Sequence, residues 1–267
     1  MPRVLTENRE ICEVKCEPYK KKISEAFERE KKVLASIEQN SAGAAYKHLN
    51  LCDEMIGCAT YYININNITV ELVNTKDNDA LNEARKMLYK AIIYLEEVVS
   101  NVVDTVQSDM EDKLASISEA PLEKRFNLIR KLGLAISLLI DAFGDNTKWK
   151  WSFVELQGRF AVVAKNLLDL KQAAKDYFDP NSPDYDNSVM YIRLIRKLYD
   201  QSATAYRDRY ELSTHRIDDM RMAILFLSGG RRVAIALGES EDAEEIKKKA
   251  GVWKQKVEVD QKAGRAK

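Results

Sequence analysis

The sequence predicts an all-α protein, an elongated antiparallel helical bundle of about six helices with coiled-coil-like pairs. Three observations lead to this prediction. Apolar residues recur at intervals of three and four over long stretches, glycine and proline number 10 and 5 among 267 residues, and 45% hydrophobic residues accompany 31% charged ones. Long helices with one buried stripe and a charged outer face have this composition. Short turns between them favour antiparallel neighbours.

The first helix is predicted to begin at Pro18, because proline is favoured in the first turn of a helix. Ile23 and Leu34 then lie on one apolar face. In the next helical stretch, residues 61–73 also resemble two alternating strands around Asn66, as in a β-hairpin. We favour a helix there, because a lone hairpin among helices would need its own packing surface.

The clearest apolar spacing follows the turn at residues 74–79. Leu81, Leu88 and Leu95 recur every seven residues, as in a coiled-coil seam. Near Asp109 the phase shifts, and a four-residue stutter would explain that shift. The sequence therefore predicts one rod of about 38 residues, roughly 57 Å long.

The following helix is predicted to open at Pro121, with Ser118 as its cap, and to end at Gly144. Residues 132–143 are apolar nearly all round. A helix without a polar face is normally buried, so we expect this one to lie at the centre of the bundle.

Another helix is predicted to begin with Asn146 or Thr147 as its N-cap and to continue to Tyr177. Its apolar residues keep strict spacing of three and four. Such regularity favours left-handed packing near 20° against a neighbouring helix.

The last part of the chain contains two long predicted helices and, between them, a short helical continuation from Arg231 to Leu237. The turn at residues 179–184 ends with Ser182 as N-cap, and a long helix is expected from there to about Leu227. The pair Gly229-Gly230 would break the chain. A final helix begins at Ser240 and is expected to fray from Asp260 onward.

We expect three parts along the chain. They are an N-terminal arm (1–17), the helical bundle (18–238) with a hinge at 179–184, and a C-terminal helix with a basic tail (239–267). The tail is basic because eight lysines and arginines from Lys247 to the end accompany two acidic residues.

Composition also limits the classes of function. Acidic and basic residues balance at 42 each, so no overall field attracts nucleic acid or a membrane surface. The most apolar stretch, 132–143, is about half of the roughly 20 residues that a membrane-spanning helix needs. The N-terminus is charged and lacks the apolar core of a signal peptide. Four cysteines without an export signal indicate reduced thiols and a cytoplasmic protein.

Two groups of residues could hold a metal. Cys12, Cys16, His48 and Cys52 are spaced as pairs four residues apart, which a zinc site could use. Burial in the core is the favoured interpretation, because free cysteine is a common buried residue. Glu211, His215 and Asp219 form the second group, and a solvated polar face is the favoured interpretation there. Gly229-Gly230 before two arginines resembles a phosphate cradle, but a helix break is favoured.

The strongest candidate for partner binding is the tyrosine-rich and arginine-rich middle of the fifth helix, together with one tryptophan. Tyrosine and arginine are enriched at binding hot spots. The alternative is a semi-polar core seam whose arginines pair with acids of the same chain. The candidate partner-binding residues are Tyr199, Tyr206, Arg207, Arg209, Tyr210, Arg216 and Trp149.

We expect a non-enzymatic protein-protein interaction or scaffold protein, acting through a helical face on other proteins or on copies of itself. No catalytic or cofactor motif is present in the sequence, so neither enzymatic activity nor a cofactor is expected. Binding of a polyanion or nucleic acid through the arginines is the first alternative, which zero net charge argues against. A metal-binding helical-bundle enzyme is the second alternative.

Overall fold

The computed structural model describes residues 2–144 and 147–265, and every regular element within them is helical. The described residues contain ten α-helices, one 3₁₀ turn and one π-helical turn, and no strand. The all-α prediction is therefore confirmed, whereas the predicted number of helices, about six, is too low. Three predicted rods are each divided in two. None of the described helices is long and apolar enough to cross a membrane.

The chain forms two compact units. The first comprises Met1–Val98 and Leu128–Lys148, and the second comprises Val99–Asn127 and Trp149–Lys267. One of the boundaries, between Asn127 and Leu128, falls within the helix α5.

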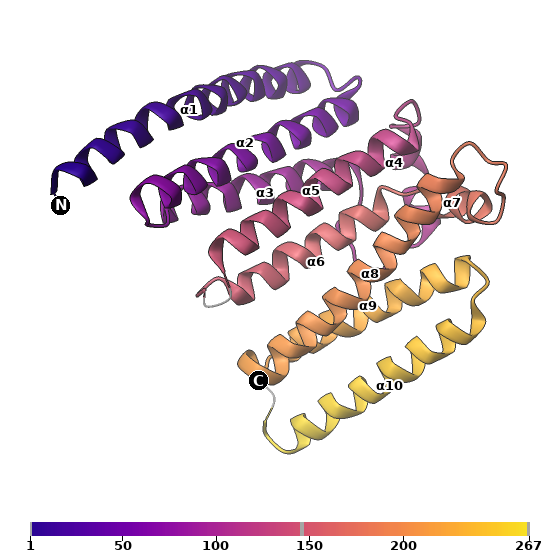
Figure 1. The fold of residues 1–267 in the computed structure, drawn as a ribbon. Helices are drawn as coiled ribbons and strands as arrows, with labels where there is room; N and C mark the ends of the chain where they lie inside the picture. The colour runs from indigo at the N-terminus through magenta and orange to yellow at the C-terminus, as the bar shows by residue number, and fades with distance from the viewer. Residues whose placement is uncertain (1, 145–146, 266–267) are drawn as a thin grey trace. The chain divides into compact units, whose positions relative to one another are not determined.

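The first unit contains three consecutive helices and most of a fourth: α1 (Pro2–Gln39), α2 (Ala44–Val73), α3 (Asn78–Val98) and α5 (Leu122–Phe143). Helices α1 and α2 are antiparallel (Figure 1). The side-chain amide of Asn8 donates to the Leu72 carbonyl at 3.0 Å, and Arg29 pairs with Glu54 at 2.6 Å. Residues 61–73 belong to α2, so the helix was the correct choice over the hairpin.

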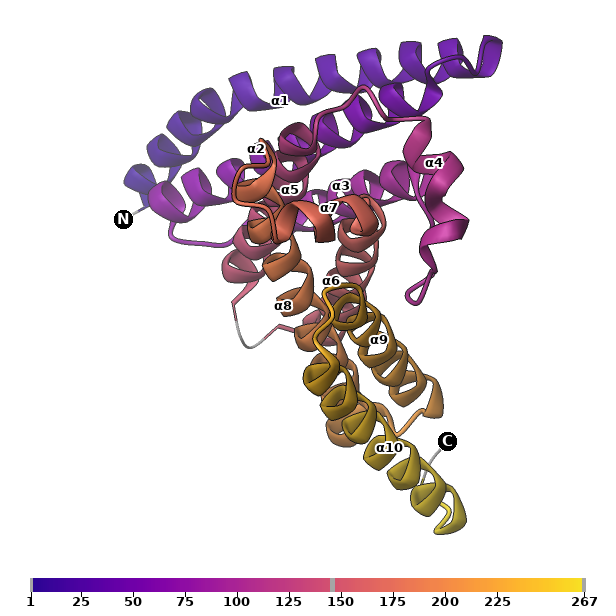
Figure 2. The same cartoon turned by 90° about the vertical axis from the view of Figure 1, so that its right-hand side faces the viewer.

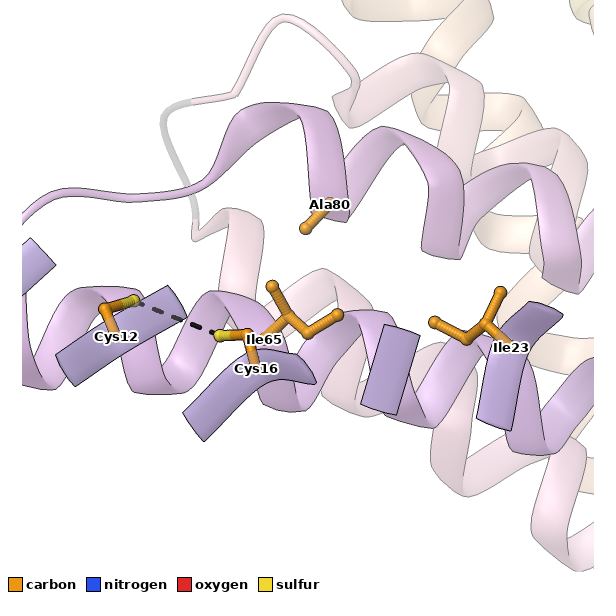
Figure 3. Close-up of a cluster of buried hydrophobic side chains, with 5 residues drawn as sticks. All are labelled: Cys12, Cys16, Ile23, Ile65 and Ala80. Carbon is orange, nitrogen blue, oxygen red and sulfur yellow. Dashed lines mark hydrogen bonds between the residues drawn. The ribbon is translucent and has the colours of Figure 1, made fainter. Parts of the chain in front are cut away.

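Small apolar side chains of α1, α2 and α3 pack together near the start of α1 (Figure 3). This cluster consists of Cys12, Cys16, Ile23, Ile65 and Ala80. Partly buried aromatic side chains cover it, including Tyr19 and Tyr61, whose ring centroids are 5.8 Å apart. The three helices therefore share one continuous apolar seam.

Pro18 lies inside α1 and does not begin it, so the predicted start of the first helix is wrong. Proline removes one hydrogen bond to the residue four positions earlier. Both Pro18 and Val14 are exposed, so water can reach the carbonyl group that loses its donor. The helix tolerates the proline because the cost falls on its solvent side.

The second unit contains the remaining elements: a 3₁₀ turn η1 (Gln107–Met110), α4 (Glu111–Ala115), α6 (Lys150–Asn166), α7 (Leu170–Tyr177), α8 (Tyr185–Arg209), a π-helical turn η2 (Tyr210–Thr214), α9 (Ile217–Ala236) and α10 (Ser240–Lys262). Helices α9 and α10 lie side by side (Figure 2). Arg196 pairs with Asp242, and Asp200 pairs with Lys249. Because both partners advance together along the chain, α8 and α10 are parallel.

The predicted 38-residue rod is wrong, because α3 ends at Val98 and a loop follows. Polar side chains of α6 and α8 bind the carbonyls of this loop. The amide of Asn166 donates to Ser100 at 2.6 Å, and the hydroxyl of Tyr199 donates to Val103 at 2.9 Å. These tertiary hydrogen bonds replace the ones that a continuing helix would have made. We call the loop at residues 99–106 the clamped loop.

The helix predicted to continue to Tyr177 is also interrupted. It ends at Asn166, and α7 begins at Leu170. Asp169 is the N-cap of α7, since its carboxylate accepts hydrogen bonds from the backbone of Lys171 and Gln172. Aspartate at this position satisfies otherwise unpaired amides. The predicted Asn146 cap lies outside the described residues.

The helix predicted to reach Leu227 is divided at residues 210–216. A π-helical turn ends at His215, which has a φ of 53°. Gly229 and Gly230 lie inside α9, so the predicted break there is wrong. A Cβ added to Gly229 would lie 2.3 Å from a Tyr199 ring carbon. The glycine therefore permits close packing between α8 and α9.

Two predictions about α5 and α10 also require correction. Leu134 and Leu138 are 62% and 41% exposed, so α5 is not buried on all sides. Helix α10 continues to Lys262, and Asp260 is buried and accepts a hydrogen bond from Tyr210, so the chain does not fray there. Coiled-coil packing of the helix pairs stays a prediction.

Candidate functional site

The tyrosines of the candidate partner surface lie in the core of the second unit. Tyr199, Tyr206 and Tyr210 are 1%, 4% and 1% exposed. Tyr199 and Tyr206 both pack against the Phe226 ring, at centroid distances of 5.3 and 5.6 Å. These contacts agree with the alternative of an intrachain core seam, because buried rings offer no area to a partner.

The hydroxyl of Tyr210 connects η2 with α10. It donates to the Asp260 carboxylate at 2.9 Å. Burial and this hydrogen bond raise the pKa of Tyr210 to about 12. The same bond, together with Lys256, lowers the pKa of Asp260. The neutral phenol and the charged carboxylate are therefore the stable forms at neutral pH.

The arginines of the candidate surface pair mainly with acids of the same chain. Arg207 pairs with Glu211 at 3.1 Å, and Arg209 pairs with Asp219. Arg216 is exposed and precedes α9. Trp149 is half-buried at the start of α6. The seven predicted residues therefore form no single exposed face in the described structure.

The cysteines lie in apolar surroundings. The sulfur atoms of Cys12 and Cys16 are 3.9 Å apart on α1, and Cys52 is fully buried on α2 with His48 one turn before it. Burial raises the pKa of Cys16 to about 11 and raises that of Cys52 further. A thiol must lose its proton to bind zinc or attack a substrate, so these environments favour the neutral, unreactive form.

The polar residues around His215 make contacts other than metal coordination. Asp219 accepts hydrogen bonds from Arg209 and Thr214, and Asp218 pairs with Arg221 at 3.2 Å. Among the described residues, no group of three or more histidines, cysteines, aspartates or glutamates is arranged to hold a metal.

A buried carboxylate connects α1 with α3 in the first unit. Glu30 is 5% exposed, and it accepts hydrogen bonds from the Lys90 ammonium at 2.5 Å and from the Tyr94 hydroxyl. Burial and the contact with Glu30 raise the pKa of Tyr94 above its ordinary value. Lys90 and Tyr94 therefore compensate the buried carboxylate of Glu30, and removal of either partner would leave it unsatisfied.

An exposed stripe on α5 was missed in the sequence. It consists of Lys131, Leu134, Leu138 and Asp141, all on the solvent side of the helix. Their spacing of three, four and three residues is that of a coiled-coil seam. This spacing was visible in the sequence, but the apolar residues around it indicated a buried helix. We call these four residues the α5 stripe.

Basic and acidic ends flank the two leucines of the α5 stripe. Lys131 contacts Asp53 of α2 at 2.8 Å, and both side chains of this ion pair are about half exposed. Exposed pairs of this kind contribute about 0–1 kcal/mol. Lys131 can therefore exchange this partner for another carboxylate at little cost.

Comparison with known families gives one match. The sequence pattern of the family described as the TP0443 family matches residues 8–261. Searches of curated proteins and of solved structures find no match to the chain.

Proposed function

The chain belongs to the TP0443 family, whose name states no activity, and we propose that it is a non-enzymatic interaction protein that acts through a helical face. The α5 stripe carries this proposal. Leu134 and Leu138 are large apolar side chains that remain exposed one turn apart. Exposed apolar groups with a polar rim are typical of protein-protein contacts.

The occupant that this surface fits is a second copy of the same chain. If two α5 helices pair antiparallel about a two-fold axis beside Ile136, Leu134 of one copy faces Leu138 of the other. In the same arrangement, Lys131 of one copy faces Asp141 of the other. A two-fold contact must be self-complementary, and the α5 stripe has this property in both apolar contact and charge.

The proposed contact is a coiled-coil-like pair in which two helices contribute the same residues. Such association is compatible with a scaffold in the cytoplasm, where the chain would present its helices in duplicate. Polyanion binding has less support, because Arg207 and Arg209 are paired with carboxylates. A metal-dependent enzyme also has less support, because burial raises the pKa of the cysteine thiols.

Light scattering after size-exclusion chromatography, over a dilution series, tests the proposal. Wild type is expected to be dimeric, and the double variant Leu134→Glu/Leu138→Glu monomeric, because it would place four carboxylates in the contact. Val252→Glu/Val259→Glu on α10 is the matched control. These valines are 63% and 61% exposed, and this variant should remain dimeric. A monomeric wild type would contradict the proposal.

A charge exchange tests the antiparallel arrangement itself. Lys131→Glu and Asp141→Lys should each weaken the dimer at low salt, because like charges then face each other across the contact. The double variant should restore it. If the double variant is weaker than either single variant, the two residues do not face each other.

A further inference from the structure

A pocket of about 240 Å³ lies in the second unit, beside the clamped loop and between α6 and α9. Its lining includes the polar residues Lys165, Asn166 and Arg232 and the apolar residues Val106, Met110 and Ile235. Small-molecule sites have this composition, an apolar lining with a few polar groups that fix orientation. Pockets for drug-sized ligands start at about 300 Å³, so the ligand would be small.

Lys165 is an unusual residue for such a lining, because it is 6% exposed. Its ammonium donates to the Thr105 carbonyl at 2.5 Å. Among the described residues no carboxylate lies within salt-bridge distance of it. Burial lowers the pKa of Lys165 to about 8, with Arg232 lowering it and Asp104 raising it by smaller amounts. The amine is therefore mainly charged at neutral pH and lacks a contacting anion.

The side chain of Asn166 contributes a hydrogen-bond acceptor that receives no hydrogen bond. It is 2% exposed, and its amide nitrogen donates to both Ser100 and Val102, at 2.6 and 3.1 Å. These two bonds fix the orientation of the side-chain amide. Its oxygen Oδ1 is buried and has no hydrogen-bond partner. Buried polar atoms are rarely left in this state, and Asn166 lines the pocket, so a ligand donor would satisfy this oxygen.

The charges around the pocket indicate what kind of donor fits. Arg232 is paired with Asp104 through two contacts, one of them 3.2 Å. Asp104 therefore contacts Arg232 and acts on the charge of Lys165 only without contact, by a smaller amount than burial does. An anionic group is favoured next to Lys165, whereas a ligand ammonium would add like charge to the site. The donor for Asn166 is accordingly a neutral hydroxyl.

We propose that this pocket binds a small aliphatic 2-hydroxy carboxylate. Its carboxylate accepts from Lys165, its hydroxyl donates to Oδ1 of Asn166, and its chain packs against Val106, Met110 and Ile235. The side chains of Lys165 and Asn166 both reach the clamped loop, at Thr105 and at Ser100 and Val102, so we place the carboxylate and the hydroxyl of the ligand on adjacent carbons. This proposal is independent of the α5 stripe.

Isothermal titration calorimetry with the full chain tests the ligand class. The probe is 2-hydroxy-4-methylpentanoate, compared with 4-methylpentanoate, which lacks the hydroxyl, with 4-methylpentane-1,2-diol, which lacks the carboxylate, and with leucine, which carries an ammonium. Each analogue should bind at least about tenfold more weakly than the probe. With 4-methylpentanoate and the diol one polar group of the site stays unpaired, and with leucine the ammonium adds like charge beside Lys165. Equal binding of the diol, or no binding of the probe, would overturn the proposal.

Two variants and one matched control locate the site. Lys165→Met keeps the aliphatic stem and removes the charge, and it should abolish binding. Ala236 lines the pocket and is exposed, so Ala236→Phe should block the pocket without disturbing the core. Lys171→Met, an exposed lysine of α7, should bind like wild type. Unchanged affinity in Ala236→Phe would place the ligand elsewhere and overturn the assignment.

The pH dependence separates a salt bridge from a covalent bond to the amine. Because the carboxylate binds the charged amine, affinity should be at least about tenfold weaker at about pH 10 than at about pH 7. An amine that formed an imine would instead react faster as it lost its proton. Borohydride trapping of Lys165 with 4-methylpentanal, without pH-dependent carboxylate binding, would favour a carbonyl ligand and overturn the proposal.

Discussion

Different kinds of contact stabilise the interior of each of the two units. In the first unit, α1, α2 and α3 follow one another as antiparallel helices, and small apolar side chains fill the seam between them. In the second unit, buried tyrosine hydroxyls add hydrogen bonds between elements to a core of apolar side chains. Tyr191 donates to the Ala164 carbonyl and Tyr199 to the Val103 carbonyl, both at 2.9 Å.

This difference explains where helices end. The spacing of apolar residues is a local property of the sequence. It can therefore continue past a point where tertiary contacts end the helix. The clamped loop ends α3 because distant polar side chains bind its carbonyls. Tertiary contacts determine a helix end of this kind. The side chains that donate to the loop carbonyls lie more than sixty residues away in the sequence.

The largest expected effect comes from removing the amide that binds the clamped loop. Asn166→Ala should lower the free energy of unfolding of the second unit by about 3 kcal/mol, because two loop carbonyls lose their buried donor. Hydrogen exchange should report the loss in the second unit while α1 and α2 keep their protection. Asn101→Ala, an exposed amide of the same loop, is the control and should change stability by less than about 0.5 kcal/mol. Equal effects of the two variants would show that the loop is not held by Asn166.

Much of the first unit could be predicted from the sequence, and less of the second. The helix at residues 61–73 was favoured because a lone hairpin would lack a packing surface, and Gly144 indicated the end of α5; the structure confirms both. Gly229 was misinterpreted, because a glycine that admits a tyrosine ring and a glycine that breaks a helix look the same in one sequence. The candidate tyrosines were found as a group, but their burial depends on Phe226, which the spacing of α8 does not indicate.

The candidate site was harder to predict than the fold. Leu134 and Leu138 lie in a stretch that is apolar nearly all round, and only packing decides which side of such a helix stays exposed. Lys165 follows Ala164 in a stripe of apolar residues. Its ammonium is bound by the carbonyl of Thr105, sixty positions away in the sequence.

A smaller effect is expected from the buried carboxylate of the first unit. Tyr94→Phe removes a hydrogen bond to the charged Glu30 and should lower the free energy of unfolding by about 2 kcal/mol. Tyr19→Phe is the control, since the contact of Tyr19 with Tyr61 is between rings. Chemical denaturation of both variants measures the difference.

The effect of Tyr94→Phe should also depend on pH. Because burial and Glu30 raise the pKa of Tyr94 above its ordinary value, the unfolded chain loses this proton first as pH rises. The stabilisation is therefore complete below the unfolded pKa of about 10 and declines above it. Wild type and Tyr94→Phe should converge in stability at alkaline pH. A constant difference across that range would mean that the hydroxyl is not bound to the carboxylate.

The smallest expected change in the free energy of unfolding comes from the contact between α8 and α9, and the sign of that change is what tests the contact. In Gly229→Ala, the new Cβ would lie 2.3 Å from the Tyr199 ring and 3.2 Å from the Val103 carbonyl. Overpacking typically costs about 1–3 kcal/mol, while alanine gains about 0.5–1 kcal/mol over glycine within a helix. The ring has little room to move, because its hydroxyl is bonded to Val103. A net loss of about 1 kcal/mol is therefore expected.

The neighbouring glycine provides the matched comparison. A Cβ at Gly230 would lie 3.8 Å from the Cβ of Tyr199, an ordinary van der Waals contact. Gly230→Ala should therefore stabilise the second unit by up to about 1 kcal/mol, from the helix preference of alanine alone. Thermal or chemical denaturation of the two variants should shift in opposite directions. If both variants are stabilised, the tyrosine ring yields easily, and the second unit depends less on its buried tyrosines than its hydrogen bonds indicate.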